Sequence, residues 1–206
     1  MRDPTHLFEG TVPPRTMKAA DIISMVTQPP FLAIVAFILL NLQVENVLDE
    51  LLFDLICVVC ALVIPVGVTY YFGKKKGNED LDVVNREDRF PPLVLGTLGY
   101  VIGSVLLYRF DAPDVVWILM VCYAVVTAAI TVITLFWKIS IHACGCMGPS
   151  IALGIAFGPA GALYFAFLPF AAWSRYIKRK HTPAQLLCGA LLGALLSGVI
   201  FTILLP

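Results

Sequence analysis

The stretch PDVVWILMVCYAVVTAAITVITLFW, residues 113–137, decides the fold class of this chain. Asp114, near its start, is its only charged residue. A helix that crosses the hydrocarbon core of a bilayer needs about 20 apolar residues, each rising 1.5 Å along the axis. This run is long enough, and it therefore predicts a transmembrane helix.

The composition of the whole chain agrees with this stretch. Hydrophobic residues make up 59% of the sequence and charged residues 14%, whereas a soluble domain carries about a quarter charged residues. The net charge is zero, so no general attraction to nucleic acid is expected and nucleic acid is excluded as a partner. The chain belongs by composition to the integral membrane proteins, and we expect a multi-pass protein of the cell membrane.

Apolar segments of similar character recur along the chain. We predict an all-α, polytopic transmembrane bundle of six to seven helices, with six if the first segment lies only at the interface. Residues 28–206 would form one transmembrane domain. Residues 1–27 would form a polar tail, in which residues 16–27 are either a short interfacial helix or partly ordered. The predicted segments are residues 28–44, 51–73, 91–108, 113–137, 140–157, 160–176 and 184–205.

One break in the apolar pattern decides the topology. Residues 140–176 could form one long helix, but Gly158-Pro159 predicts a tight turn between two helices. Two helices that run out and back keep His142 and His181 on the same side of the bundle. A single helix would place the two histidines on opposite sides.

Basic residues concentrate on one face of the predicted bundle. With seven segments, the opposite face has Arg109 as its only basic residue, beside several carboxylates. The positive-inside rule makes the basic face cytoplasmic. That face collects the other 13 of the 14 Lys and Arg residues, namely Arg2, Arg15, Lys18, Lys74, Lys75, Lys76, Arg86, Arg89, Lys138, Arg175, Lys178, Arg179 and Lys180.

Small residues recur at four-residue spacing in two segments. Gly189, Gly193 and Ser197 share one face of the last segment, and Gly99 and Gly103 share a face of an earlier one. Such faces let helix backbones approach closely in lipid. We expect close packing within the bundle, and a homodimer is the alternative.

Three polar clusters, residues 85–89, 140–142 and 174–185, lie at membrane boundaries of the basic face. They supply arginines, two histidines and a serine near predicted helix starts. Guanidinium groups bind phosphate oxygens in a planar fork. One histidine can attack phosphorus while the other protonates the leaving oxygen. No Cys, His or carboxylate cluster with metal-ligand spacing accompanies them, so we expect chemistry without a metal or other cofactor.

Two of these clusters also carry helix-start signals. Thr182-Pro183 has the composition of an N-cap followed by proline in the first helical position. Ser140 is placed to cap the helix over residues 140–157. The polar residues are therefore expected at the ends of helices that enter the membrane.

The third cluster resembles the last motif of the type 2 phosphatidic acid phosphatase superfamily, which includes the vanadium haloperoxidases. The family pattern is KxxxxxxRP, then PSGH, then SRxxxxxHxxxD. Ser174-Arg175 and His181 match the last motif, and Gln185 replaces its closing Asp. The resemblance covers residues 74–205.

The other two motifs match less completely. Ser140 and His142 match the second motif, in which Ile139 and Ile141 occupy the proline and glycine positions. Arg89, followed by Phe90-Pro91, resembles the end of the first motif. Its lysine position is occupied by Asp82.

The resemblance implies a phosphatase-like helical core and a role for each matching residue. His181 would be the nucleophile that forms a phosphohistidine, and His142 would protonate the leaving group and then activate water. Gln185 would orient His181 in place of the family's Asp, but without its charge. The residues implied to hold the phosphate are Arg86, Arg89, Ser140 and Arg175.

These residues predict an integral membrane phosphatase that hydrolyses a lipid or polyprenyl phosphate or diphosphate. A catalytically weakened relative that only binds lipid phosphates is one alternative, because Gln185 and Ile141 depart from the family pattern. A small membrane transporter is another. Transport pathways often need charged residues inside the membrane, and charged residues are nearly absent from the predicted segments, with Asp54, near a helix end, as the exception away from the polar clusters and segment boundaries.

Overall fold

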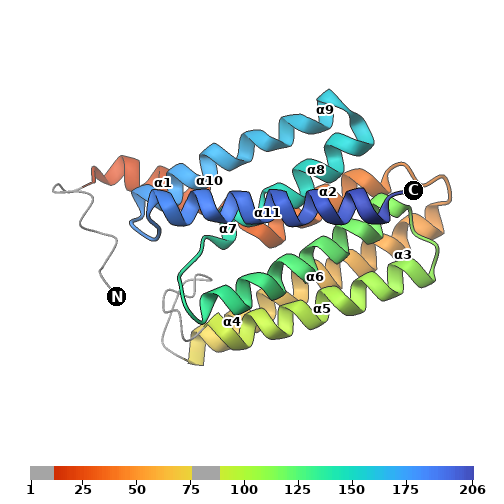
Figure 1. Cartoon of the computed structure of the whole chain (residues 1–206), viewed down its shortest axis with the longest axis horizontal. Coiled ribbons are helices and arrows are strands. Elements are labelled where there is room, and N and C mark those ends of the chain that lie inside the picture. Colours follow the sequence, from red (N-terminus) through yellow and green to blue (C-terminus); the bar gives the residue numbers. More distant parts are fainter. Residues whose placement is uncertain (1–11, 76–88) are drawn as a thin grey trace.

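The computed structural model describes residues 12–75 and 89–206 (Figure 1), and these are helical, without a strand in either range. The predicted all-α class is confirmed. The α-helices are α1 Pro14–Val26, α2 Pro29–Asn41, α3 Val47–Cys57, α4 Ile64–Lys75, α5 Phe90–Arg109, α6 Asp114–Thr134, α7 Ile141–Gly145, α8 Met147–Phe157, α9 Pro159–Ala162, α10 Phe167–Ile177 and α11 Pro183–Leu204. A π-helix, Val58–Val63, joins α3 to α4, and a 3₁₀-helix, Leu163–Ala166, precedes α10.

Four of the described helices are long and apolar enough to cross a membrane. They are the continuous helix Val47–Lys74, α5, α6 and α11. The pair α1 and α2 gives a fifth candidate span, bent by 49° at its break. This supports a multi-pass membrane protein. The count of six to seven spans stays a prediction, because it also needs the shorter helices between α6 and α11.

The helices over residues 141–177 run out and back, as predicted. Gly158 ends α8 with φ 60° and ψ −137°, a conformation that glycine adopts without a Cβ clash. Pro159 then begins α9, and α10 runs back toward the starting end of the bundle (Figure 1). There α7 packs against both α10 and α11. Both ends of this hairpin therefore meet, whether or not it spans the bilayer completely.

The faces of small residues pack within the bundle. A Cβ added at Gly189 would lie 2.6 Å from the carbonyl oxygen of Ser140, and one at Gly193 would meet the carbonyl oxygen of Cys144. A Cβ at Gly103 would lie 2.8 Å from the Cβ of Cys60 in the π-helix. Close packing within the chain is confirmed, so a second copy could reach these faces only if the bundle opened.

Candidate active site

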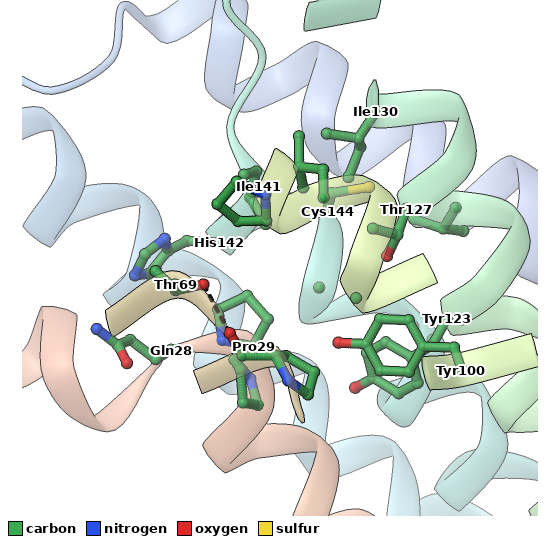
Figure 2. A pocket seen from close by; sticks show the side chains of 18 of the residues that line it. Gln28, Pro29, Thr69, Tyr100, Tyr123, Thr127, Ile130, Ile141, His142 and Cys144 are labelled. Carbon is green, nitrogen blue, oxygen red and sulfur yellow. Dashed lines mark hydrogen bonds between the residues drawn. The ribbon is translucent and has the colours of Figure 1, made fainter. Parts of the chain in front are cut away.

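A pocket with a volume of about 150 Å³ lies where the three predicted clusters meet. Figure 2 shows this pocket with His142 at its polar end. Its lining includes Arg89, His142, Arg175 and His181. These side chains come from segments up to 92 residues apart in sequence (181 − 89). The structure therefore brings four of the seven predicted site residues to one cavity.

Each of the four lies at the end of a helix. Arg89 directly precedes α5, His142 follows the first residue of α7, and Arg175 lies in the last turn of α10. His181 precedes α11 by two residues. The exposed fractions are 4% for Arg89, 8% for His142, 1% for Arg175 and 2% for His181, so these charged and polar groups are withdrawn from bulk solvent.

The start of α11 orients the ring of His181. Thr182 and Gln185 form the predicted cap as a reciprocal capping box: the hydroxyl of Thr182 accepts from the Gln185 backbone N–H, and the amide oxygen of Gln185 accepts from the Thr182 backbone N–H. The same Gln185 oxygen lies 3.2 Å from Nδ1 of His181. An amide oxygen only accepts hydrogen bonds, so Nδ1 carries the proton.

This contact fixes which nitrogen of His181 can react. Because the backbone N–H of Thr182 requires an acceptor, the amide of Gln185 cannot present its NH₂ group at that position without losing the capping box. In the neutral ring, a proton on Nδ1 leaves the lone pair on Nε2. Gln185 is therefore placed to orient the imidazole through its oxygen, the role that the resemblance implies for it, although it adds no negative charge.

The electrostatic environment keeps His181 neutral. Burial, then the positive charges of Arg175, Arg89 and Lys138, and then His142 together lower the pKa of His181 from 6.5 to about 2. A neutral imidazole is the nucleophilic form. The same cationic field favours an anion in the pocket, because an anion would offset the charges that repel a proton.

Ser140 stabilises the site without lining the pocket. It is fully buried and is absent from the pocket lining. Its hydroxyl accepts from the backbone N–H of Ala143 at 3.3 Å, which confirms the predicted cap of α7. Its own backbone N–H donates to the carbonyl oxygen of Gln185 at 3.3 Å. Ser140 thereby ties the segment that carries His142 to the segment that carries His181.

Helix α1 covers the site, and the sequence alone did not place it there. Nη1 of Arg175 donates to the hydroxyl of Ser24 at 2.9 Å, and Lys178 forms an ion pair with Asp21 at 2.9 Å. Gln28, between α1 and α2, lines the pocket. The segment predicted as an interfacial helix or a partly ordered tail is therefore a helix that packs on α10. No sequence motif signals these contacts, because they join residues about 150 positions apart.

The pocket continues from the polar end into the bundle as an apolar crevice. Tyr100 and Tyr123 are part of this inner wall (Figure 2). Among the described residues that line the pocket, none is Asp or Glu. The predicted phosphate ligand Arg86 lies outside the described residues. The apolar wall between α5, α6 and α4 includes Pro65, Val66, Leu93, Gly96, Val126 and Ile130.

No protein-family model, curated protein or solved structure matches this chain. The family resemblance therefore rests on the spacing of the polar motifs. The geometry described above is independent of it.

Proposed function

We propose that this chain is an integral membrane phosphatase that hydrolyses a lipid or polyprenyl phosphate or diphosphate through a phosphohistidine. The observation that carries the proposal is the pocket that joins His142 and His181 to two buried guanidinium groups and continues into an apolar crevice. Guanidinium forks suit a phosphoryl group, and the crevice suits the hydrocarbon part of the same substrate.

In the first step, Nε2 of His181 attacks phosphorus with its lone pair. The bond between phosphorus and the bridging oxygen breaks, and His142 donates a proton to that oxygen, so the lipid leaves as an alcohol or as a monophosphate. Arg89 and Arg175 hold the other phosphoryl oxygens, where negative charge gathers in the transition state. Preorganised donors of this kind contribute about 3 kcal/mol each.

In the second step, a water molecule attacks the phosphohistidine. His142, now neutral, accepts a proton from this water, the N–P bond breaks, and its electron pair returns to Nε2 of His181. Inorganic phosphate leaves, and both imidazoles regain their starting charges. His142 thus acts once as acid and once as base.

The test is phosphate release from lipid phosphates by the purified protein in the presence of a chelator of divalent metals. We expect the wild type to release phosphate and His181→Ala to release none. His6, the remaining histidine of the sequence, gives the matched control: His6→Ala should retain activity. The His142→Ala variant should release phosphate far more slowly than the wild type, because both the acid of the first step and the base of the second step are lost.

The uncharged amide of Gln185 favours one other function, lipid phosphate binding without turnover, and the same test distinguishes it. Because it stabilises a charged imidazole less than a carboxylate would, the site could bind lipid phosphates without turnover. Saturable binding by the wild type, lost in Arg175→Ala, with no phosphate release would assign the binding-only function. The absence of both binding and release would contradict the phosphatase proposal and leave transport as the alternative.

A further inference from the structure

Two tyrosines place their hydroxyl groups in the mostly apolar depth of the pocket, whose lining also includes Thr127. Tyr100 on α5 and Tyr123 on α6 stack with ring centroids 5.4 Å apart and an interplanar angle of 28°, and both line the pocket. In Figure 2 their hydroxyl groups point away from their helices and toward the middle of the pocket, in the direction of Pro29.

The hydroxyl of Tyr123 is buried and has no hydrogen-bond partner among the described residues. The whole Tyr123 side chain is only 6% exposed. A buried hydroxyl without a partner is costly, and a phenylalanine would fill the same volume without that cost. No hydrogen bond among the described residues therefore explains the presence of this hydroxyl group.

The tyrosine pair lies deeper in the bundle than the cationic end of the pocket. Tyr100 follows Arg89 by 11 residues on α5 (100 − 89), which corresponds to a rise of about 16 Å along the helix axis. The wall between them carries Leu93 and Gly96. This rise is between backbone positions, and the side chains of Arg89, Tyr100 and Tyr123 all line the same pocket, so a molecule with its phosphate at Arg89 would extend its chain toward Tyr123.

We propose that Tyr123, supported by Tyr100, binds an oxygen atom that the substrate carries on its chain near the phosphate, such as an ester carbonyl or a hydroxyl. This proposal rests on the proposed function, which places the phosphate at the arginines. It narrows the substrate to an oxygen-bearing lipid phosphate, of the glycerol or sphingoid-base type, and disfavours a polyprenyl phosphate. A plain hydrocarbon chain would leave the Tyr123 hydroxyl without a partner. A carbonyl or hydroxyl oxygen of the substrate would accept a hydrogen bond from it.

The experiment measures the binding of three non-hydrolysable phosphonates to the purified protein: a diacylglycerol analogue, a sphingoid-base analogue and an isoprenoid analogue. The variants are Tyr123→Phe and the double variant Tyr100→Phe with Tyr123→Phe. Tyr108→Phe is the matched control, because Tyr108 is exposed near the other end of α5. Thermal unfolding of each variant without ligand reports whether the fold is retained.

We expect Tyr123→Phe to weaken binding of one or both oxygen-bearing phosphonates by roughly fivefold to tenfold, the loss of about one hydrogen bond. Binding of the isoprenoid phosphonate should stay unchanged, and the ligand-free variant should unfold at the wild-type temperature or above it. The analogue that loses affinity identifies the oxygen as a carbonyl or a hydroxyl.

Equal affinities of Tyr123→Phe and the wild type for all three phosphonates would overturn this inference and leave the phosphatase proposal intact. A similar loss for all three, or a lower unfolding temperature without ligand, would also overturn it, because the hydroxyl would then have a structural role. If the wild type binds none of the three, the proposed function fails as well.

Discussion

Gln185 shows how one side chain can cap a helix and set the chemistry of a histidine. Its amide oxygen accepts from the backbone of Thr182 and faces Nδ1 of His181, both at 3.2 Å. The first contact determines the orientation of the amide, and the amide then determines the tautomer of the ring. The acid–base state of the proposed nucleophile is therefore a local property of the first turn of α11.

Removing this oxygen should harm activity more than it harms stability. In Gln185→Leu the ring of His181 loses its orienting acceptor, and we expect phosphate release to fall by roughly 100-fold or more, as when a histidine takes the wrong tautomer. Thr182→Ala breaks the same capping box at a cost of about 1 kcal/mol but keeps the contact with the imidazole. It should therefore retain most of the activity in the same assay. Equal losses in the two variants would contradict the tautomer argument.

The lowered pKa of His181 predicts acid-sensitive folding. The pKa falls from 6.5 to about 2 on folding, so below about pH 6.5 the unfolded chain binds a proton that the folded chain does not. Stability is therefore present above pH 6.5 and is lost as the pH falls toward 2. We expect the unfolding temperature of the wild type to drop more between pH 7 and pH 5 than that of His181→Gln. Parallel pH profiles for the two proteins would contradict the burial of a neutral His181.

At the scale of elements, the contact of α7 with α11 sets the distance between the two imidazole-bearing segments. Gly189 lies against the carbonyl oxygen of Ser140, and the backbone N–H of Ser140 donates to Gln185. The absence of a side chain at Gly189 is what permits this approach. The small residue Gly189 on α11 therefore helps to position the site residues and also lets the helices pack closely.

A methyl group at Gly189 should separate these helices. We expect Gly189→Ala to lower stability by about 1–3 kcal/mol, the usual cost of overpacking, and to reduce phosphate release further than the loss of folded protein explains. Gly198→Ala on the same helix is the control, because a Cβ there meets nothing within 4 Å. It should be neutral or stabilising. Thermal unfolding in detergent and the release assay check both variants, and equal behaviour of the two would contradict the close contact.

Elements whose signals are local were predictable from the sequence. The caps at Ser140 and Thr182 and the turn at Gly158 each depend on residues within a few positions, and the structure confirms all three. The π-helix Val58–Val63 was not predicted, because its pattern of apolar residues is that of an ordinary helix. The position of α1 was not predictable either, since the contact of Ser24 with Arg175 joins segments 151 residues apart.

At the scale of the whole molecule, one end of the bundle collects the candidate site. Helix α1, the start of α5, α7, the end of α10 and the start of α11 lie together there, whereas the connections between α2 and α3 and between α5 and α6 lie at the other end (Figure 1). The convergence of Arg89, His142 and His181 was predictable, because it follows from counting helices. The tyrosine pair inside the pocket was not, because its sequence signal is that of any membrane helix.

The charge distribution predicts that the site end faces the cytoplasm. Lys18→Cys, at an exposed position of α1, and Glu45→Cys, at an exposed position after α2, mark the two ends. Both should be made in a Cys188→Ser background, because the other five cysteines are buried. In intact cells we expect a membrane-impermeant maleimide to label Glu45→Cys and to label Lys18→Cys only after permeabilisation. The reverse pattern would place the site on the outer face.

The central claim is that His142, His181, Arg89 and Arg175 enclose a single phosphoryl group, and a structure of the protein with bound vanadate tests it most directly. Vanadate adopts the five-coordinate geometry of a phosphoryl group under attack. The account predicts vanadium bonded to Nε2 of His181, with both guanidinium groups on its oxygens and His142 opposite His181. Vanadate bound away from His181, or a pocket that stays empty at saturating vanadate, would contradict it.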